Sequence, residues 1–272
     1  MDTKELLKFY RSRPETLKAM DLMGPEGQMD SGGDKKLREV AGLIEIILRY
    51  VREFIPDQDL RVLEGSCGKS YLGFALCVLL EELEDREVKY CGVDSDPELI
   101  ERCRKLSAKL GLSDAAFFAC RTVEFDSSVD FNLATSLHAC DTATDELIAK
   151  GIELDVRLIL TVPCCQSQIR GQIKNGHPLT PMTDYGPARY RFANLLTDTL
   201  RGQFLNAAGY HVKLDEIGSP RLTPKNLCIC ARKVKRRSRS RRDLGYRKLR
   251  EMFDVRPAIE KLCPGIIDGD AD

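Results

Sequence analysis

Apolar and polar residues repeat with one period before residue 60 and with another after it. Residues 3–55 have a helical pattern, apart from a glycine-rich break at residues 24–33. Residues 34–55 carry apolar side chains every three or four positions, which predicts a long helix with one face packed on a core. The apolar positions of that helix are Leu37, Val40, Leu43, Ile44, Ile47, Leu48 and Val51.

Short apolar runs of strand length begin after residue 60, and helical patterns follow the first, second, fourth and fifth of them. The predicted strands are residues 61–64, 88–94, 115–120, 130–137, 156–163, 209–217 and 226–234. The predicted helices are residues 70–83, 97–111, 143–151 and 188–209, with a helical C-terminal segment from residue 244. This alternation predicts an α/β protein whose sheet is mostly parallel and doubly wound. Ligands of such sheets bind beyond the carboxyl ends of the strands.

Unusual residues stand at those carboxyl ends, beginning with GSCGKS after the first strand. This stretch is not a P-loop, because Leu63 stands where the first glycine of that motif must be. It is not a dinucleotide fingerprint either, because Cys67 replaces the second glycine. Glu64 ends the first strand and Asp94 ends the second, where a carboxylate can accept both hydroxyls of a ribose. The turn and Asp94 together favour a nucleoside cofactor; the alternative is a tight turn with a helix-capping acid.

The fourth and fifth strands end in SLHACDTATD and PCC. His138 can act as a general base on a hydroxyl or a ring nitrogen, and Asp141 can orient it or cap the next helix. Cys164 or Cys165 can instead be a nucleophile, or the pair can be a structural turn. Zinc held by His138, Cys140, Cys164 and Cys165 is a third possibility. Because zinc-type spacings such as CxxC are missing, we predict no metal centre. The remaining alternative is small residues packed beneath a cofactor.

The eleven cysteines lie mostly inside apolar runs, which is typical of reduced thiols in a cytoplasmic protein rather than of a disulfide framework. No apolar run approaches the roughly 20 residues that span a membrane, and the N-terminus lacks the apolar region of a signal peptide. We therefore expect a cytoplasmic location and no membrane partner.

The formal net charge is zero, yet one segment is strongly basic. RKVKRRSRSRR (232–242) has eight basic side chains and no acid, so the rest of the chain has eight acidic groups in excess. A basic segment on an acidic body favours a polyanionic partner such as RNA. The alternative is a solvated tail segment without a partner.

A second segment mixes aromatic and basic side chains after the fifth predicted strand. The residues concerned are Tyr185, Arg189, Tyr190, Arg191 and Phe192. Such a mixture can stack on bases and hold phosphate, although ordinary surface residues at a helix start give the same pattern.

Four stretches resemble, in this order, a branch of the class I S-adenosylmethionine-dependent methyltransferases: VLEGSCGKSYLGFAL, CGVDSDPELIERC, SLHACDTATDELIAKGI and LTVPCCQ. That branch includes a methyltransferase-like domain fused to a glutathione-S-transferase-type domain. Residues 35–39, KKLRE, are similar to a KKxHE helix that precedes the first strand in related proteins. The resemblance covers residues 34–233.

The resemblance implies a Rossmann-like fold with a seven-stranded sheet, helices on both faces, and S-adenosyl-L-methionine as cofactor. It implies contacts of the cofactor's methionine part with Glu64, Gly65, Ser66, Cys67 and Gly68, of its ribose with Asp94, and of its adenine with Thr122 and Val123. Ser95, Leu137 and His138 complete the predicted cofactor-binding set, the last two beside the methyl group. Glu64 and Cys67 depart from the usual aspartate and the usual middle glycine of the turn.

We predict three regions: an N-terminal helical extension (1–58), a methyltransferase domain (59–233) and a basic C-terminal extension (234–272). The expected activity is methyl transfer from S-adenosylmethionine to RNA, either tRNA or rRNA. The alternatives are a small-molecule or protein methyltransferase, and a non-catalytic RNA-binding protein that retains the fold.

Overall fold

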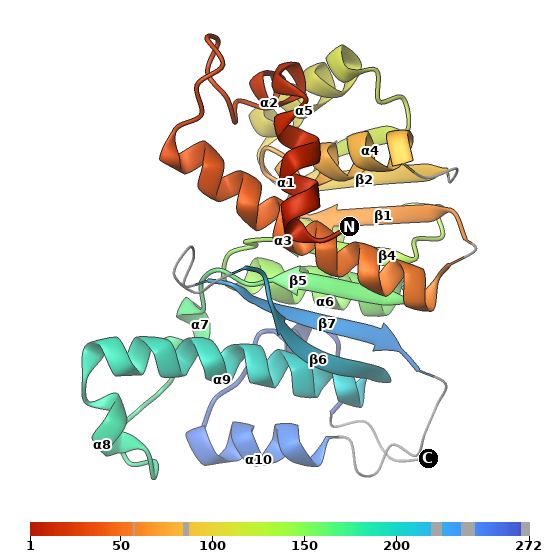
Figure 1. Cartoon of the computed structure of the whole chain (residues 1–272). Coiled ribbons are helices and arrows are strands. Elements are labelled where there is room, and N and C mark those ends of the chain that lie inside the picture. The colour runs from red at the N-terminus through yellow and green to blue at the C-terminus, as the bar shows by residue number, and fades with distance from the viewer. Residues whose placement is uncertain (57, 84–86, 219–224, 235–242, 268–272) are drawn as a thin grey trace.

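The structure, a computed structural model, describes residues 1–56, 58–83, 87–218, 225–234 and 243–267 (Figure 1). It is built around a seven-stranded sheet with the order β3-β2-β1-β4-β5-β7-β6. The strands are β1 Leu60–Gly65, β2 Val88–Asp94, β3 Ala115–Ala119, β4 Leu133–Leu137, β5 Leu158–Val162, β6 Tyr210–Glu216 and β7 Leu227–Lys233. β1 to β5 pair in parallel, and β7 lies antiparallel between β5 and β6. The predicted fold, a mostly parallel seven-stranded sheet, is confirmed.

Helices cover both faces of this sheet. They are α1 Thr3–Arg11, α2 Pro14–Ala19, α3 Ser31–Phe54, α4 Tyr71–Leu83, α5 Pro97–Leu110, α6 Thr142–Glu153, α7 Ser167–Arg170, α8 Thr180–Thr183, α9 Gly186–Ala207, α10 Leu244–Phe253 and α11 Ile259–Leu262, with a 3-10 turn η1 at Thr122–Glu124. α1 to α5 share one hydrophobic core with one face of the sheet. α6, α9, α10 and α11 share a second core with the other face. Alternate strand residues enter each core because side chains alternate across a strand.

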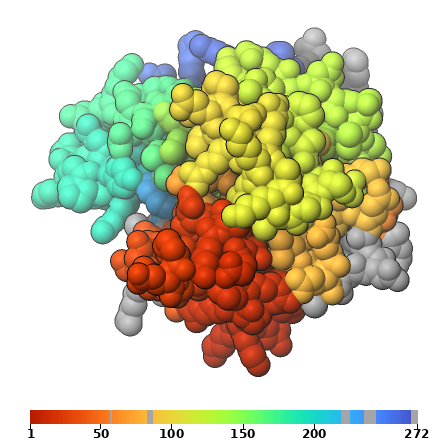
Figure 2. Space-filling model, turned by 90° about the horizontal axis from the view of Figure 1, so that it is seen from above, coloured from red at the N-terminus to blue at the C-terminus, as the bar shows by residue number. Residues whose placement is uncertain are grey.

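The N-terminal helices pack onto the sheet layer. Tyr10 on α1 donates a hydrogen bond to the Ala75 carbonyl on α4, at 2.9 Å. Figure 2 shows the N-terminal segment against the segment of α5, where Arg102 pairs with Asp21. Asp30 caps α3 by accepting a bond from the Gly33 backbone at 2.6 Å. These contacts join the N-terminal helices to α4 and α5, and the boundary at residue 58 stays a prediction.

The C-terminal helices also belong to the packed body of the protein. Tyr246 on α10 is fully buried and meets Phe204 on α9 edge to face, with ring centroids 5.6 Å apart. Ile259 on α11 is fully buried within the same core. Residues 244–267 therefore complete one face of the molecule. Residues 235–242, most of the predicted basic segment, lie outside the described residues, and the boundary at 234 stays a prediction.

Two features outside the sheet bear on the sequence predictions. All eleven cysteines lie among the described residues, and each is a free thiol. Among the described residues, none of the helices combines the length and the apolar character needed to cross a bilayer.

The predicted fourth strand, residues 130–137, begins only at Leu133. Just before this strand, the Asn132 side chain bonds the backbones of Asp59 and Arg61 at the start of β1.

Candidate active site

The turn after β1 rests on a buried carboxyl group. Glu64 is 2% exposed and accepts hydrogen bonds from the Tyr90 hydroxyl and, at 3.3 Å, from the Ser70 hydroxyl. Burial raises the pKa of Glu64 to about 7, although these hydrogen bonds oppose the shift. The Glu64 carboxyl group therefore stabilises the turn through its hydrogen bonds with Ser70 and Tyr90. A direct contact with the methionine part of a cofactor, expected from the resemblance, stays a prediction.

The backbone of the turn is tightly wound. Ser66, Gly68 and Ser70 all have positive φ angles of 51 to 54°, a region that residues other than glycine rarely adopt. At Gly65 a Cβ atom would lie 2.8 Å from the Leu147 side chain and 2.9 Å from that of Thr122. Gly65 thus lets η1 and α6 approach the turn closely, and the predicted adenine-side residue Thr122 is brought against it.

Asp94 closes the other side of the turn. One of its oxygens accepts from the Gly68 backbone at 2.8 Å, and the other from the Asp96 backbone at 3.0 Å. The structure therefore brings Asp94 to the glycine turn, as expected from the alignment of parallel strand ends. Ser95 is exposed beside it, and Val123 is half-buried on η1. Cys67 is buried below the turn near Cys103, whose thiol donates to the Gly68 carbonyl at 3.4 Å.

His138 lies just past β4 and pairs with a carboxylate that the sequence analysis did not assign. Its Nε2 is 3.1 Å from Glu39 on α3, a side chain that is 5% exposed. Burial alone would raise the pKa of Glu39, but hydrogen bonds from His138 and Lys36 lower it to about 2. The other ring nitrogen, Nδ1, is buried without a hydrogen-bond partner among the described residues. With Nε2 donating to Glu39, Nδ1 is left as a hydrogen-bond acceptor.

The backbone at His138 has a φ of 66°, in the left-handed region. That conformation costs energy in a residue with a side chain, so the surrounding contacts must impose it. The His138 backbone donates to the Val162 carbonyl at the end of β5, at 2.8 Å. Leu137, the last residue of β4, is half-buried beside it.

Asp141 neither orients His138 nor caps α6, which corrects both roles considered for it. It precedes α6 with a φ of 50° and makes no side-chain bond to the first turn of that helix. Its Oδ1 instead accepts from the Gln168 backbone on α7, at 3.0 Å. The Asp141 side chain is therefore bound to the segment that follows β5 and not to α6.

A buried arginine ties these segments together. Arg201 on α9 is 2% exposed and pairs with Asp145 on α6 at 2.6 Å and with Asp198 at 3.2 Å. It also donates to the Asp141 carbonyl at 2.6 Å. Gln166, just past β5, donates to both oxygens of Asp198 at 3.1 Å. The network holds the ends of β4 and β5 against α9.

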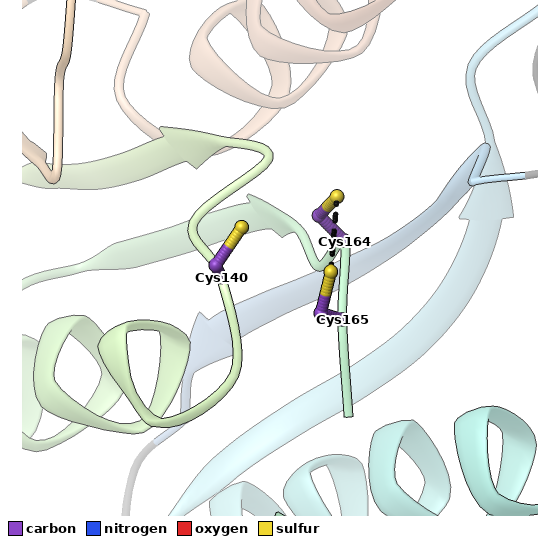
Figure 3. Close-up of side chains that lie close together, drawn as sticks. All are labelled: Cys140, Cys164 and Cys165. Atoms are coloured by element: carbon purple, nitrogen blue, oxygen red, sulfur yellow. Dashed lines mark hydrogen bonds between the residues drawn. The ribbon is translucent and has the colours of Figure 1, made fainter. Parts of the chain in front are cut away.

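The thiols of Cys140, Cys164 and Cys165 lie together at the ends of β4 and β5 (Figure 3). All three sulfur atoms lie within 4.8 Å of one another. Burial raises the pKa of Cys164 to about 12, and it also raises that of Cys140. Both groups are then thiols at neutral pH, which does not favour the predicted nucleophilic role, since the thiolate is the reactive form.

A cavity of about 660 Å³ opens beside this edge of the sheet. Its lining residues come from the end of β5, from α9 and from the start of β7: Pro163, Gln166, Pro187, Tyr190, Arg191, Asn194, Leu195, Asp198, Lys225 and Leu227. The Tyr190 ring is 38% exposed, with the Lys225 ammonium 4.7 Å and the Arg170 guanidinium 5.3 Å from its centroid. Aromatic and cationic groups therefore meet in this cavity.

A family model described as a methyltransferase domain matches residues 35–172, about half of the chain. The chain belongs to this family. It contains a class I S-adenosylmethionine-dependent methyltransferase domain, and the β3-β2-β1-β4-β5-β7-β6 order of its sheet is typical of that class. The cofactor predicted from the sequence, S-adenosylmethionine, is thereby confirmed.

Curated relatives of this methyltransferase include the glutathione S-transferase C-terminal domain-containing proteins of mouse and human. Each is 28% identical over 153 residues, a match that covers 56% of this chain and 22% of the relative. The chain thus spans less than a quarter of the length of these relatives. Among solved structures, magnesium protoporphyrin IX methyltransferase from Synechocystis with bound SAM has a TM-score of 0.49 at 12% identity, covering 86% of this chain and 98% of that one.

Sequence reasoning missed two supports of the methyltransferase site. Glu39 was considered only as part of the KKLRE helix, and no role was assigned to it. Arg201 was considered only as part of a long helix. The sequence does contain a feature that points to both residues, because each is charged and lies one helical turn from a core-facing leucine. Glu39 lies one turn from Leu43, and Arg201 lies one turn from Leu205. A charge at such a position indicates a buried partner.

Proposed function

We propose that this methyltransferase acts on RNA, and that the cavity around Tyr190 receives the nucleotide to be methylated. The arrangement of Tyr190 with Lys225 and Arg170 carries the proposal. An exposed aromatic ring can stack on an unpaired base, and neighbouring cations can hold the phosphates that flank it. The cavity begins at Pro163, directly after β5, at the edge of the sheet where ligands of parallel sheets bind.

The basic segment 232–242 supports the same substrate class. Arg232 and Lys233 end β7, and Lys225 precedes that strand, so cationic groups are present at both ends of β7. The six remaining basic residues, between 235 and 242, lie outside the described residues. A polyanion gains affinity from many such contacts, whereas a small neutral substrate gains none. We also propose that the protein belongs to the branch of methyltransferases that is marked by the LHAC and PCC motifs.

His138 is the proposed general base. Its Nε2 donates to Glu39, and this leaves Nδ1 to accept the proton of a hydroxyl or ring nitrogen as the methyl group is transferred. Glu39 would fix the tautomer and the ring orientation, as carboxylates do for histidine bases elsewhere. The cofactor supplies the methyl group; the protein orients the acceptor and receives its proton.

The test is methyl transfer from isotope-labelled S-adenosylmethionine to total RNA, with the wild type and Asp94→Ala compared side by side. We expect label in RNA with the wild type only, and digestion of that RNA identifies the methylated nucleoside. Tyr190→Ala should abolish most of the transfer, whereas Tyr190→Phe, which keeps the ring, should retain it. Absence of label from RNA, with S-adenosylhomocysteine still bound in calorimetry, would overturn the RNA proposal and point to a small-molecule or protein acceptor.

A cytoplasmic location is proposed on the evidence of the thiols. Eleven free cysteines persist most readily in a reducing compartment. Cell fractionation with an antibody to the native chain tests this, and recovery in an oxidising compartment would contradict it.

A further inference from the structure

Three thiols that are far apart in the sequence converge at one end of the sheet. Cys140 comes from the segment between β4 and α6, and Cys164 and Cys165 come from the segment after β5 (Figure 3). Neighbouring side chains on an extended strand point to opposite sides. The backbone after β5 departs from that pattern, because the Cys164 and Cys165 sulfur atoms are only 3.7 Å apart. The Cys140 sulfur lies within 4.8 Å of both.

These distances match a particular coordination geometry. Zinc bound by thiolates has Zn–S bonds of about 2.3 Å, and in a tetrahedron this places the sulfur atoms about 3.8 Å apart. The Cys164–Cys165 pair already has that separation, and Cys140 reaches it with a shift of at most about 1 Å. We propose that Cys140, Cys164 and Cys165 bind one zinc ion through three thiolates.

The protein holds the two segments in place before any ion arrives. The Asp141 backbone donates to the Cys165 carbonyl at 3.1 Å, and the His138 backbone donates to the Val162 carbonyl at 2.8 Å. The Asp141 side chain crosses between the segments to the Gln168 backbone at 3.0 Å, and Arg201 binds the Asp141 carbonyl. Every thiol of the cluster is therefore within one residue of a bond that joins the two segments. Such support of the ligands is what a preorganised metal site requires.

The chemistry of the donors selects the ion. Three sulfur donors form a soft set that favours zinc over magnesium or calcium, which prefer oxygen. Each thiol loses its proton to solvent when the ion binds, and the cation offsets the cost that burial imposes on the thiolate. Cys140 is exposed and the other two are half-buried, so an ion can enter from solvent. Three protein ligands leave the fourth position of a tetrahedron open, as in catalytic zinc sites.

The cluster adjoins the cavity through sequence neighbours. Pro163 and Gln166 line that cavity and flank Cys164 and Cys165 in the chain. An ion at the thiols would thus fix the wall of the substrate cavity. Zinc binding itself does not depend on RNA being the methyl acceptor, so the two proposals can fail separately.

The experiment uses the untagged full chain, because a histidine tag binds zinc itself. The chain is titrated with zinc against a chromogenic competitor, and with Co²⁺ to record its absorption spectrum. We expect one zinc per chain, and thiolate-to-cobalt charge-transfer bands together with the d–d bands of tetrahedral cobalt. Cys140→Ser, Cys164→Ser and Cys165→Ser should each weaken binding at least about tenfold. Cys120→Ser is the matched control, a partly exposed cysteine at the end of a different strand, and should bind as the wild type does.

A second measurement needs no variant. Iodoacetamide labelling of the wild type, followed by peptide mass spectrometry, should show Cys140, Cys164 and Cys165 protected by zinc and exposed by a chelator, with Cys120 unchanged. The proposal is overturned if the untagged chain binds no stoichiometric zinc, if cobalt gives no thiolate bands, or if zinc leaves the labelling of the three cysteines unaltered. None of these readouts involves RNA.

Discussion

At the scale of single residues, Glu64 has a consequence for stability that can be measured. Its pKa is about 7 in the folded chain because of burial, against 4.5 for an ordinary glutamate. Between these values the folded state holds a proton that the unfolded state has released, so the free energy of unfolding falls as the pH rises from about 4.5 to about 7.

Glu64→Gln keeps the shape of the side chain and removes this titration. We expect the unfolding free energy of the variant to decline less than that of the wild type over the same pH interval, by a difference on the order of a few kcal/mol. Urea unfolding at several pH values between about 4.5 and about 7.5 measures it. Parallel pH profiles for the two proteins would show that Glu64 titrates normally in the fold.

The pair of Glu39 and His138 is the second feature at this scale. Glu39→Gln keeps a hydrogen-bond acceptor for His138 but removes the charge, so we expect kcat for methyl transfer to fall about tenfold or more with the KM for S-adenosylmethionine little changed. Steady-state kinetics of Glu39→Gln, His138→Asn and the double variant measure this. Lys36→Gln, which removes the other partner of Glu39, is the matched control and should retain most activity. Losses that add in the double variant would show that the two residues act independently.

At the scale of secondary-structure elements, Arg201 joins α9 to α6 and to the residues that follow β4. Arg201→Met would leave Asp145 and Asp198 buried without their cation, and we expect a loss of roughly 3 to 5 kcal/mol in the free energy of unfolding. Replacing the two aspartates by asparagine in the same chain should restore part of that loss, because the buried charges are then gone. Denaturant unfolding compares the three proteins. An unchanged midpoint for Arg201→Met would mean that the network contributes little to the joint between α6 and α9.

At the scale of the whole molecule, the C-terminal region has two parts that should act differently. Residues 244–267 contribute to the core, and residues 235–242 carry six basic side chains. Residues 244–267 carry buried core side chains such as Tyr246 and Phe253, so deleting them should unfold the protein rather than test RNA binding. Replacing the six basic residues between 235 and 242 by glutamine changes none of the core residues named above.

We expect this glutamine variant to bind RNA more weakly than the wild type. The slope of log K against log salt should become less steep by about 0.7 for each phosphate of a single strand that the variant no longer neutralises. Thermal unfolding should match the wild type. Fluorescence anisotropy with a labelled RNA over a range of salt concentrations provides the measurement. Equal slopes for the two proteins would rule out a role for the segment in phosphate binding.

The sequence by itself determined the order and type of the elements, because hydrophobic periodicity is a local property of the chain. The second strand was predicted at its observed bounds, 88–94, and parallel strand ends necessarily placed Glu64, Asp94 and His138 at one edge of the sheet. The antiparallel direction of β7 was not predicted, since a strand's direction depends on which neighbour it pairs with.

Only the tertiary structure decided which side chains meet. Glu39 and His138 lie 99 positions apart in the chain, and no spacing rule connects a residue on α3 with one after β4. The sequence predicts no metal centre, because its cysteines lack the regular spacings of common zinc sites. Cys140 and the pair Cys164–Cys165 come together through the pairing of β4 with β5 and a turn that brings adjacent thiols to one side. Which distant segments pair depends on the packing of the whole chain, so the local pattern of apolar residues does not predict it.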